Sequence, residues 1–497
     1  MANSFLLGLD VGSSSIKCAL VETDTGVCRW RAQSPTEEMA ITAIQPGWAE
    51  QRPEDWWHHV VHAVRSVIRQ SRAQPAEVKA IGISYQMHGL VAVDSRGVPV
   101  RPSIIWCDSR AVKTGEKAAQ QLGTDFCFDH YLNLPGNFTA AKLAWVKENE
   151  PVVFERMATF FLPGDYIAFR LTGERTTTVP GLSEGILWDF REQRPAHELL
   201  RALDIPASLL PRITDTFGIQ GTLAAAAAEQ LGLQADTPIS YRAGDQPNNA
   251  FSLNVLQPGE TAATAGTSGV VYAVTDQKPV DRQARVNTFV HVTHTPTQPR
   301  QGMLLCVNGT GSANRWLRQV TGLEGYEEMN RLASAVQIGS DGLSIFPFGN
   351  GAERMLGNRS LQASVHQVDF NRHGRAHVCR AVQEGIVFAL AYGHQLVQQL
   401  GSPTRVIRAG HANMFLSPVF REAFVNTFDV PLELFDTDGA TGAALGAGIG
   451  AGLYPTYADA FVGLKRLSVT EPTAPLVSAY QEAYHRWEVS LKRQLDW

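Results

Sequence analysis

At 497 residues the chain is too long for one ordinary hydrophobic core, so its length predicts at least two domains. An apolar fraction of 44%, a charged fraction of 18% and a net charge of -5 are typical of a globular protein and leave no electrostatic footprint for nucleic acid. Six cysteines without C-x-x-C spacing argue against a zinc site or a disulfide framework and fit a reducing compartment.

The beginning of the chain has neither a basic segment nor a long apolar one, so it does not resemble a signal peptide. No uninterrupted apolar stretch is long enough to span a bilayer. Together with the cysteine pattern, these features predict a cytoplasmic protein whose partners include neither a membrane nor a nucleic acid.

The first predicted element is a hairpin of two short apolar strands, residues 5–9 and 16–21. The turn between them contains only small residues, which leaves its backbone N–H groups and hydroxyls open to a partner. Asp10 ends the first strand and faces this turn. The stretch has two interpretations: a surface hairpin with a solvated carboxylate, or a phosphate-holding turn in which Asp10 carries a metal ion or its water shell.

Strand-like and helical runs then alternate, which favours an α/β protein. Residues 53–68 predict a helix with an inward apolar face of Trp56, Trp57, Val60, Val64 and Ile68. Further predicted elements are a strand at 78–84, a short strand at 104–105, a helix at 138–148 and a strand at 238–243.

Polar residues follow three of these strands. Gln86 and His88 form a cluster suited to sugar hydroxyls, although a lone His is more often structural. The segment from Trp106 through Arg110 either lines a polyol pocket or contains an ordinary Asp–Arg pair. Asp245 is either a catalytic group at a strand end or the N-cap of the helix that begins at QPNNAF.

A second hairpin of the same design follows at residues 260–274, with a Gly and hydroxyl turn at 266–269. Two such hairpins suggest a duplicated architecture. The Pro- and Gly-containing segment 254–259 is the expected seam, which predicts domains at 1–253 and 254–497. A cleft between the two halves would present both turns to one polyphosphate.

The rest of the chain predicts a loop formed by residues 346–348 and the Gly-rich residues after them, a helix at 377–399 and a strand at 405–409. The Ala/Gly-rich segment 440–452 predicts a helix that packs closely on a neighbour. The glycines of that last segment do not match the dinucleotide-binding pattern. Residues 181–185 match G-x-S-x-G, the nucleophile elbow of serine hydrolases, but Pro195 makes a long following helix improbable and no HGGG-type segment precedes the motif.

Seven motifs occur in one order: DVGSSSIK, SYQMHG, WCDSR, AGDQ, AGTSG, AGHAN and TGAALGAG. This ordered set, which spans nearly the whole chain, resembles the FGGY family of carbohydrate kinases within the actin and hexokinase superfamily. The resemblance implies an α/β fold of two RNase H-like (actin-like ATPase) domains with a substrate cleft between them. It also implies a sugar-binding N-terminal domain and a C-terminal domain that holds most of the ATP.

The resemblance implies a role for each matched residue. Asp245 would be the general base, and Asp10 would orient Mg²⁺ through water. The residues implied to contact the sugar are Gln86, Met87, His88, Trp106, Asp108, Arg110 and Gln246. Those implied to bind ATP are Gly12, Ser13, Ser14, Ser15, Lys17, Gly266, Thr267, Ser268, Gly311, Gly410 and Asn413. The chain contains no Walker P-loop, so the two hairpin turns would hold the phosphates.

Within the family, the QMHG and W-x-D-x-R segments are most similar to kinases of D-xylulose. The implied reaction is therefore ATP-dependent phosphorylation of a ketopentose hydroxyl, from D-xylulose to D-xylulose 5-phosphate. The GDQ segment is similar to glycerol kinases instead, so glycerol, L-ribulose, sedoheptulose and gluconate are alternative substrates. A non-catalytic ATP-binding protein is a further alternative. The oligomeric state stays open, with a homodimer among the options.

Overall fold

The computed structural model describes residues 4–495, and its internal contacts divide the chain into two compact units. The first unit comprises Met1–Asn254, Phe289–Arg300 and Thr437–Leu464. The second comprises Val255–Thr288, Gln301–Asp436 and Lys465–Trp497. The chain therefore returns twice to the first unit, whereas the predicted domains were two consecutive stretches.

The first unit is built on a six-stranded mixed sheet. Strands β1, β5 and β14 are parallel, while β2, β3 and β13 each pair antiparallel to a neighbour. In spatial order the strands are β13 (Phe217–Thr222), β14 (Pro238–Gly244), β5 (Val78–Tyr85), β1 (Phe5–Val11), β2 (Ile16–Glu22) and β3 (Cys28–Ser34).

The second unit has a seven-stranded sheet in which β15, β21 and β22 are parallel and β16, β18 and β23 are antiparallel to their neighbours. In spatial order its strands are β17 (Asn287–Val290), β18 (Gln301–Val307), β16 (Gly269–Thr275), β15 (Glu260–Ala265), β21 (Val406–Gly410), β22 (Leu432–Phe435) and β23 (Arg466–Thr470).

The two sheets repeat one pattern. Each begins with a three-stranded antiparallel meander, continues with two strands parallel to the first, and closes with an antiparallel strand (β3-β2-β1-β5-β14-β13 and β18-β16-β15-β21-β22-β23). The first hairpin of each meander carries one of the two predicted turns. The expected duplication is therefore confirmed.

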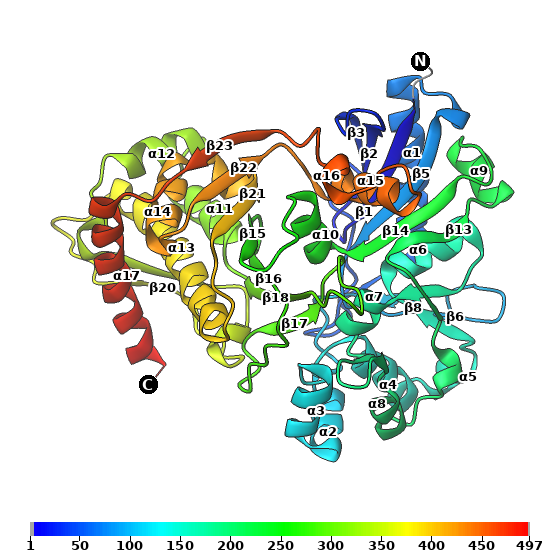
Figure 1. Ribbon diagram of the computed structural model, residues 1–497. Helices are drawn as coiled ribbons and strands as arrows, with labels where there is room; N and C mark the ends of the chain where they lie inside the picture. Colours follow the sequence, from blue (N-terminus) through cyan, green and yellow to red (C-terminus); the bar gives the residue numbers. More distant parts are fainter. Residues whose placement is uncertain (1–3, 496–497) are drawn as a thin grey trace. The chain divides into compact units, whose positions relative to one another are not determined.

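Helices cover these sheets within each unit (Figure 1). Those of the first unit are α1 (Pro53–Ser71), α2 (Val112–Leu122), α3 (Thr124–Tyr131), α4 (Thr139–Asn149), α5 (Pro151–Glu155), α6 (Pro163–Thr172), α7 (Val179–Glu184), α8 (His197–Ala202), α9 (Ala225–Leu231), α10 (Asp245–Ser252), α15 (Gly439–Gly450) and α16 (Tyr457–Ala460). Those of the second unit are α11 (Gly311–Val320), α12 (Tyr326–Ser334), α13 (Arg375–Gln399), α14 (Pro418–Phe428) and α17 (Ala474–Gln494).

Helix α15 lies unusually close to the first sheet, where it contacts β1, β5 and β14. A Cβ added to Gly82 of β5 would lie 1.9 Å from the carbonyl oxygen of Ala443, so only a glycine fits beneath this part of the helix. The Ala/Gly-rich composition of the segment is thus explained by backbone-to-backbone packing, in agreement with the helix predicted to pack closely on a neighbour.

Most predicted elements are confirmed, with boundaries that move by a few residues. Helix α1 buries Trp56, Trp57, Val60 and Val64, while Ile68 is half-buried at the edge of the core. The predicted loop is wrong for residues 346–348, whereas the Gly-rich residues 349–352 after them do lie outside helices and strands. Pro347 instead lies in β19 (Ser344–Phe348), which pairs only with β20 (Gln362–His366), and a two-stranded ribbon tolerates a missing N–H. Phe346 packs edge-on against Trp487.

Shorter strands complete the units. They form the pairs β4–β7 (Glu50–Gln51 and Ser103–Ile104), β6–β8 (Val91–Val93 and Thr159–Phe161), β9–β12 (Thr176–Thr178 and Arg212–Thr214) and β10–β11 (Trp188–Asp189 and Arg194–Pro195).

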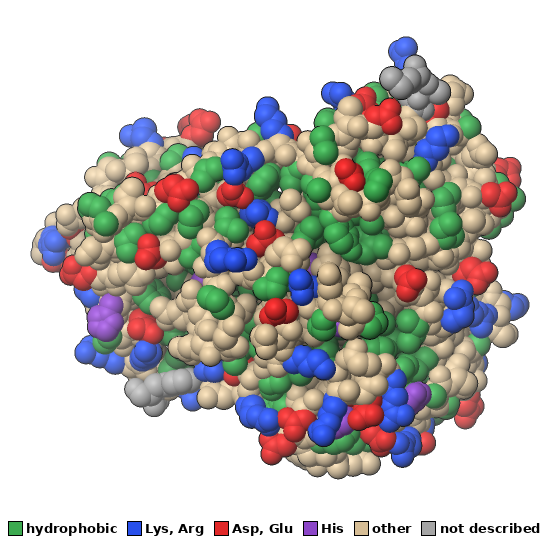
Figure 2. Space-filling view, in the orientation of Figure 1, with side chains coloured by type: hydrophobic (Ala, Val, Ile, Leu, Met, Phe, Trp, Pro, Cys, Tyr) green, Lys and Arg blue, Asp and Glu red, His purple; other side chains and the backbone are tan. Residues whose placement is uncertain are grey.

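The surface and the cysteines agree with the composition. Charged side chains of both signs are interspersed over the face shown in Figure 2. All six cysteines are free thiols. Over residues 4–495, none of the helices combines the length and the apolar character that crossing a membrane requires.

Candidate active site

Asp10 is held at the end of β1 by two neighbouring elements. The hydroxyl of Ser84, its register partner on β5, donates a hydrogen bond of 2.9 Å to Oδ1. Gly439, the first residue of α15, lies directly against the carboxyl group. Burial raises the pKa of Asp10, and the charge of the nearby Lys17 opposes this shift. A carboxylate at a helix N-terminus is also stabilised by the helix dipole.

The turn after Asp10 is closed by a hydrogen bond from the N–H of Gly12 to the carbonyl of Ser15 (3.1 Å). Two side chains fix Ser13: Gln51 donates to its carbonyl (2.7 Å) and the indole of Trp106 donates to its hydroxyl (3.2 Å). Ser14 and Lys17 are exposed beside it. Trp106, which was predicted to contact the sugar, thus hydrogen-bonds to Ser13, which was predicted to bind ATP.

Asp245 follows the parallel strand β14, next to β5 in the sheet. Gly244 is the N-cap of α10 and Asp245 is its first residue, so the interpretation of Asp245 as the cap is wrong. Burial, followed by the charge of Asp10, raises the pKa of Asp245 to about 7. Gln246 follows it and is partly buried. The geometry leaves Asp245 as a carboxyl group able to take up a proton near neutral pH.

Gln86, Met87 and His88 follow β5. Gln86 is buried, and over the part of the chain that the structure describes its side-chain carbonyl oxygen has no hydrogen-bond partner. Met87 is buried against Gly244. A buried, unsatisfied acceptor beside a strand end is an anomaly that a bound hydroxyl would remove.

His88 has a left-handed backbone, with φ of 61°. Its Nδ1 lies 2.9 Å from the carbonyl oxygen of Glu184, and its ring makes edge and tilted contacts with Phe138 and Phe289. Because a carbonyl oxygen only accepts, Nδ1 carries a proton and donates it to the carbonyl of Glu184.

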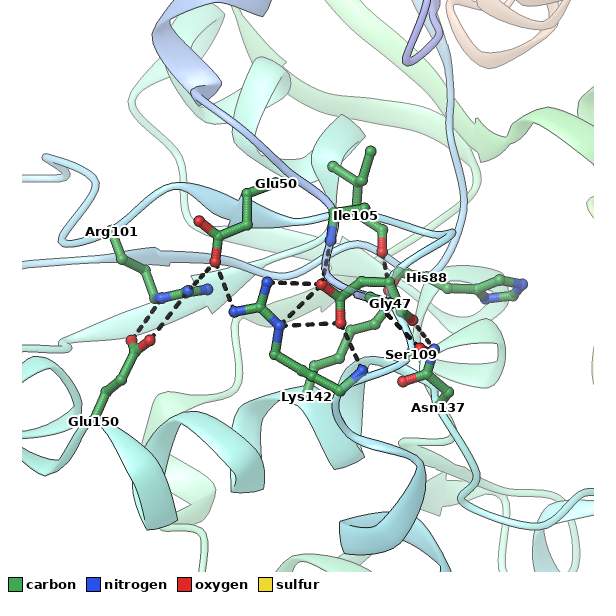
Figure 3. A network of polar contacts seen from close by, with 12 residues as sticks. Gly47, Glu50, His88, Arg101, Ile105, Ser109, Asn137, Lys142 and Glu150 are labelled. Atoms are coloured by element: carbon green, nitrogen blue, oxygen red, sulfur yellow. Dashed lines mark hydrogen bonds and ion pairs between the residues drawn. The ribbon is translucent and has the colours of Figure 1, made fainter. Parts of the chain in front are cut away.

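Asp108 and Arg110 belong to a buried polar network, part of which is shown in Figure 3. Arg110 binds Asp108 through two nitrogens (2.9 and 2.7 Å), binds Glu50 (2.7 Å), and stacks 3.8 Å above the ring of Trp48. The N–H of Ala49 also donates to the carboxylate of Asp108, at 2.6 Å. These contacts are the ordinary Asp–Arg pair, and they favour a structural role over direct contact with a sugar. Trp106, in contrast, is 46% exposed.

Glu184 is a residue that the sequence analysis missed. Its side chain is buried beside Gly244, and Oε2 lies 3.9 Å from Nδ1 of His88. Burial, then the charges of Asp245 and Asp165, raises the pKa of Glu184 well above its usual range, although Tyr85 and His88 partly oppose this shift. Glu184 therefore holds a proton more readily than an exposed glutamate does. The sequence feature that could have pointed to Glu184 is its position in the segment GLSEG, residues 181–185.

The same segment excludes the serine hydrolase. Ser183 is buried in α7, where its hydroxyl donates to the carbonyl of Pro180 (2.8 Å) and accepts from the N–H of Val290 (2.9 Å). A nucleophile must reach its substrate, and this hydroxyl is both occupied and enclosed.

The second unit contains a cavity of about 360 Å³, which is the size of a small-molecule site. Four predicted ATP residues line it, whereas Ser268 and Gly410 are not among the lining residues. The lining comprises Ala265, Gly266, Thr267, Gly311, Ser312, Asn314, Arg315, Tyr326, Asn330, Asn413, Met414, Leu416 and Ser417. The side chains of Arg315, Tyr326 and Asn330 were not predicted.

The second turn is anchored to the start of α11. The N–H of Gly311 donates to the carbonyl of Gly266 (2.8 Å), and the N–H of Ser312 donates to that of Thr267 (3.2 Å). A Cβ on Gly311 would lie 2.4 Å from the oxygen of Gly266, so only a glycine permits this approach. The turn is held rigidly at the edge of the cavity.

Within residues 4–495, no group of three or more His, Cys, Asp or Glu side chains is arranged to hold a metal ion. The described residues therefore do not form a metal site made entirely of protein ligands.

Known families match both units. The N-terminal domain of the FGGY family of carbohydrate kinases matches residues 5–252, and its C-terminal domain matches residues 261–453. The chain belongs to the FGGY family of carbohydrate kinases. The two repeated sheets are thus the two RNase H-like domains of an actin-like kinase, and the predicted fold class is confirmed.

The kinase is similar to the xylulose kinase of Bacillus subtilis, with 27% identity over 408 residues that cover 81% of this chain and 79% of the relative. It is also similar to the crystal structure titled a xyloylose kinase from Brucella ovis, with 25% identity, a TM-score of 0.87, and coverage of 98% of this chain and 99% of the other. The gluconate kinase structure from Lactobacillus acidophilus, at 22% identity, has the same fold with a TM-score of 0.89 and covers 99% of this chain and 98% of its own.

Proposed function

We propose that this kinase transfers the γ-phosphoryl group of ATP to a hydroxyl of D-xylulose, giving D-xylulose 5-phosphate and ADP. The observation that carries the proposal is Asp245, a carboxyl group at the end of a parallel strand whose pKa lies near 7. Similarity to proteins named xylulose kinase supports the choice of sugar.

In the proposed reaction the sugar hydroxyl oxygen attacks the γ-phosphorus and the bond to the bridging oxygen of ADP breaks. Asp245 accepts the proton of that hydroxyl. A carboxylate suffices as the base because the transition state of phosphoryl transfer is loose, so that positioning and charge stabilisation contribute most of the acceleration. Burial and the charge of Asp245 raise the pKa of Glu184, which disfavours a second negative charge beside Asp245.

The sugar would lie against the residues that follow β5 and β14. The unsatisfied side-chain oxygen of Gln86 is an acceptor and suits a hydroxyl donor, and the imidazole of His88 would add a second polar contact. Gln246 adds an amide beside the base, and Trp106 adds an exposed ring. Polar groups beside an apolar surface are typical of sites that bind polyols.

ATP would occupy the cavity of the second unit, with Asn413 and Tyr326 toward the nucleoside and Gly266 and Thr267 toward the phosphates. Asp10 fits a Mg²⁺ ion, because Mg²⁺ keeps several waters and is usually held by one or two carboxylates together with phosphates. One oxygen of Asp10 is oriented by Ser84, which presets the group for that role. When bound, the ion would neutralise charge on the phosphates.

The proposal is tested by measuring ADP release with ATP, Mg²⁺ and each of D-xylulose, L-ribulose, sedoheptulose, gluconate and glycerol. D-xylulose should give the highest kcat/KM and raise the melting temperature most, since a ligand of the native state stabilises it. Turnover of another sugar with none of D-xylulose would overturn the choice of substrate. ATP binding without turnover in the presence of any of these sugars would favour the non-catalytic alternative.

A further inference from the structure

Lys142 of α4 is a fully buried cation that binds backbone oxygens and no carboxylate. Its Nζ donates to the carbonyl of His88 (2.8 Å) and to that of Ile105 (3.0 Å). Figure 3 shows Lys142 rising from α4 toward these two residues. Among the ion pairs of the described residues, none includes Lys142.

The two carbonyls belong to two separate loops of the candidate sugar site. His88 ends the segment that follows β5, and Ile105 immediately precedes Trp106. One ammonium group therefore spans both loops. Its distance to each oxygen fixes the separation of the two segments that carry the proposed sugar contacts.

Neighbouring side chains of α4 act on the same loops. The hydroxyl of Thr139 donates to the carbonyl of Gly89 (3.3 Å), and the amide of Asn137, just before the helix, donates to the carbonyl of Asp108. With Lys142, these residues occupy four carbonyl groups of the two loops. We refer to Asn137, Thr139 and Lys142 as the α4 clamp.

The backbone of His88 explains why support is needed there. A histidine at φ of 61° occupies a region that side chains other than glycine enter at a cost. Lys142 holds its carbonyl and Glu184 holds its ring, so the unfavourable conformation is fixed at both ends. These two hydrogen bonds, from Lys142 and to Glu184, therefore fix the direction in which Nε2 of His88 points.

A buried ammonium group is a costly way to fill a core, since an apolar side chain of similar size is often as stable or more stable. We propose that Lys142 is a positioning residue for the sugar, which sets the spacing of the His88 and Trp106 loops through their carbonyl groups. The inference rests on the proposed function, because it takes these loops as the sugar site.

Lys142→Met tests the inference, with Lys147→Met as the matched control. Lys147 lies on the same helix and also donates to a backbone carbonyl, that of Asp204, which is outside the candidate site. We expect Lys142→Met to raise the KM for sugar by about 10- to 100-fold, the effect of a small misplacement of contact groups, while the KM for ATP stays within about twofold. Lys147→Met should leave both KM values unchanged.

A second readout needs no substrate. Hydrogen exchange at the amides of Leu90 and Asp108, which bond to the carbonyls of Ile104 and Ile105, should accelerate in Lys142→Met and not in Lys147→Met. If Lys142→Met does not fold, Thr139→Val removes one bond of the α4 clamp and should give a smaller change in the same direction.

The outcomes separate this inference from the proposed function. A wild-type protein without sugar kinase activity would overturn the proposed function and leave the exchange experiment to decide whether the α4 clamp fixes the loops. An active wild type whose sugar KM is the same in Lys142→Met would overturn the inference alone. Equal changes in the two methionine variants would also overturn it, since they would reflect general destabilisation.

Discussion

The carboxyl groups of Asp10 and Asp245 interact electrostatically, and the charge of Asp10 adds to burial in raising the pKa of Asp245 to about 7. Asp10 lies near the end of β1 and Asp245 directly follows β14, and β5 lies between these two strands in the sheet. Because like charges disfavour each other, Asp245 holds a proton more readily than an isolated aspartate. The following predictions begin from this pair.

Asp245→Asn should lower kcat by about 10²- to 10⁴-fold, which is the usual contribution of a general base. The amide is nearly isosteric and still binds a hydroxyl, so the KM for sugar should change less. Steady-state kinetics on the purified variant make the measurement. Asp236→Asn is the control, since Asp236 is exposed on the turn before β14. Near-normal turnover in the folded Asp245 variant would remove it from the mechanism.

Asp245→Asn should also be more stable than the wild type, by an amount that depends on pH. The pKa of Asp245 is raised in the folded protein from 3.8 to about 7, so between these values the folded state holds a proton that the unfolded state has lost. The stability of the wild type relative to Asp245→Asn therefore falls as the pH rises from about 4 to about 7 and is constant above it. Melting temperatures across pH 4–8 should show the advantage of the variant growing over this interval. An advantage that is independent of pH would contradict the raised pKa.

His88→Asn should raise the KM for D-xylulose by about 5- to 150-fold, which corresponds to about 1–3 kcal/mol of lost hydrogen bonding. Asparagine is preferred to alanine here because it tolerates the left-handed backbone of His88. The KM for ATP should not change. His130→Ala, which removes a histidine paired with Asp189 elsewhere in the unit, is the control. A sugar KM equal to that of the wild type would show that the ring does not bind the sugar.

Gly311→Ala should raise the KM for ATP by about tenfold and leave the KM for sugar unchanged. The added methyl group would lie 2.4 Å from the carbonyl of Gly266, so α11 and the second turn must separate. Gly325→Ala is the matched control, because a Cβ there meets no atom within 4 Å. Nucleotide affinity is measured by calorimetry with a non-hydrolysable ATP analogue. An unchanged affinity would place the nucleotide away from this turn.

The sequence allowed both hairpins, strands β5, β14 and β21 and the positions of Asp10 and Asp245 to be predicted, because each depends on local apolar patterns and on residues at strand ends. Strand β22 was not predicted. Pro347 misled the assignment of β19, since the chain has no local sign that the strand pairs on one side only. The predicted boundaries of α4, residues 138–148, were also close to the observed Thr139–Asn149, because the apolar periodicity of a helix is a local property of the sequence.

Features that depend on distant packing could not be predicted. The raised pKa of Glu184 results from its burial and from the carboxyl groups of residues 165 and 245, which only the folded chain brings together. The role of Lys142 was equally invisible, since lysines on helices are usually exposed. The Asp–Arg pair of residues 108 and 110 was suspected, but its enclosure by Glu50 and Trp48 comes from a segment far away in sequence.

Helix α15 imposes an order on biosynthesis. The sheet of the first unit is translated by residue 244, yet the helix that lies against β1, β5 and β14 and places Gly439 beside Asp10 begins only at residue 439. At about 5–20 residues per second, the ribosome takes about 10–40 s to bridge that interval. Throughout that time the nascent first unit has one sheet face uncovered and its Asp10 carboxyl group incompletely enclosed. The first unit therefore waits for α15 although its sheet is translated early, and a chain that ends before α15 would present an apolar sheet face to chaperones and leave Asp10 without its helix.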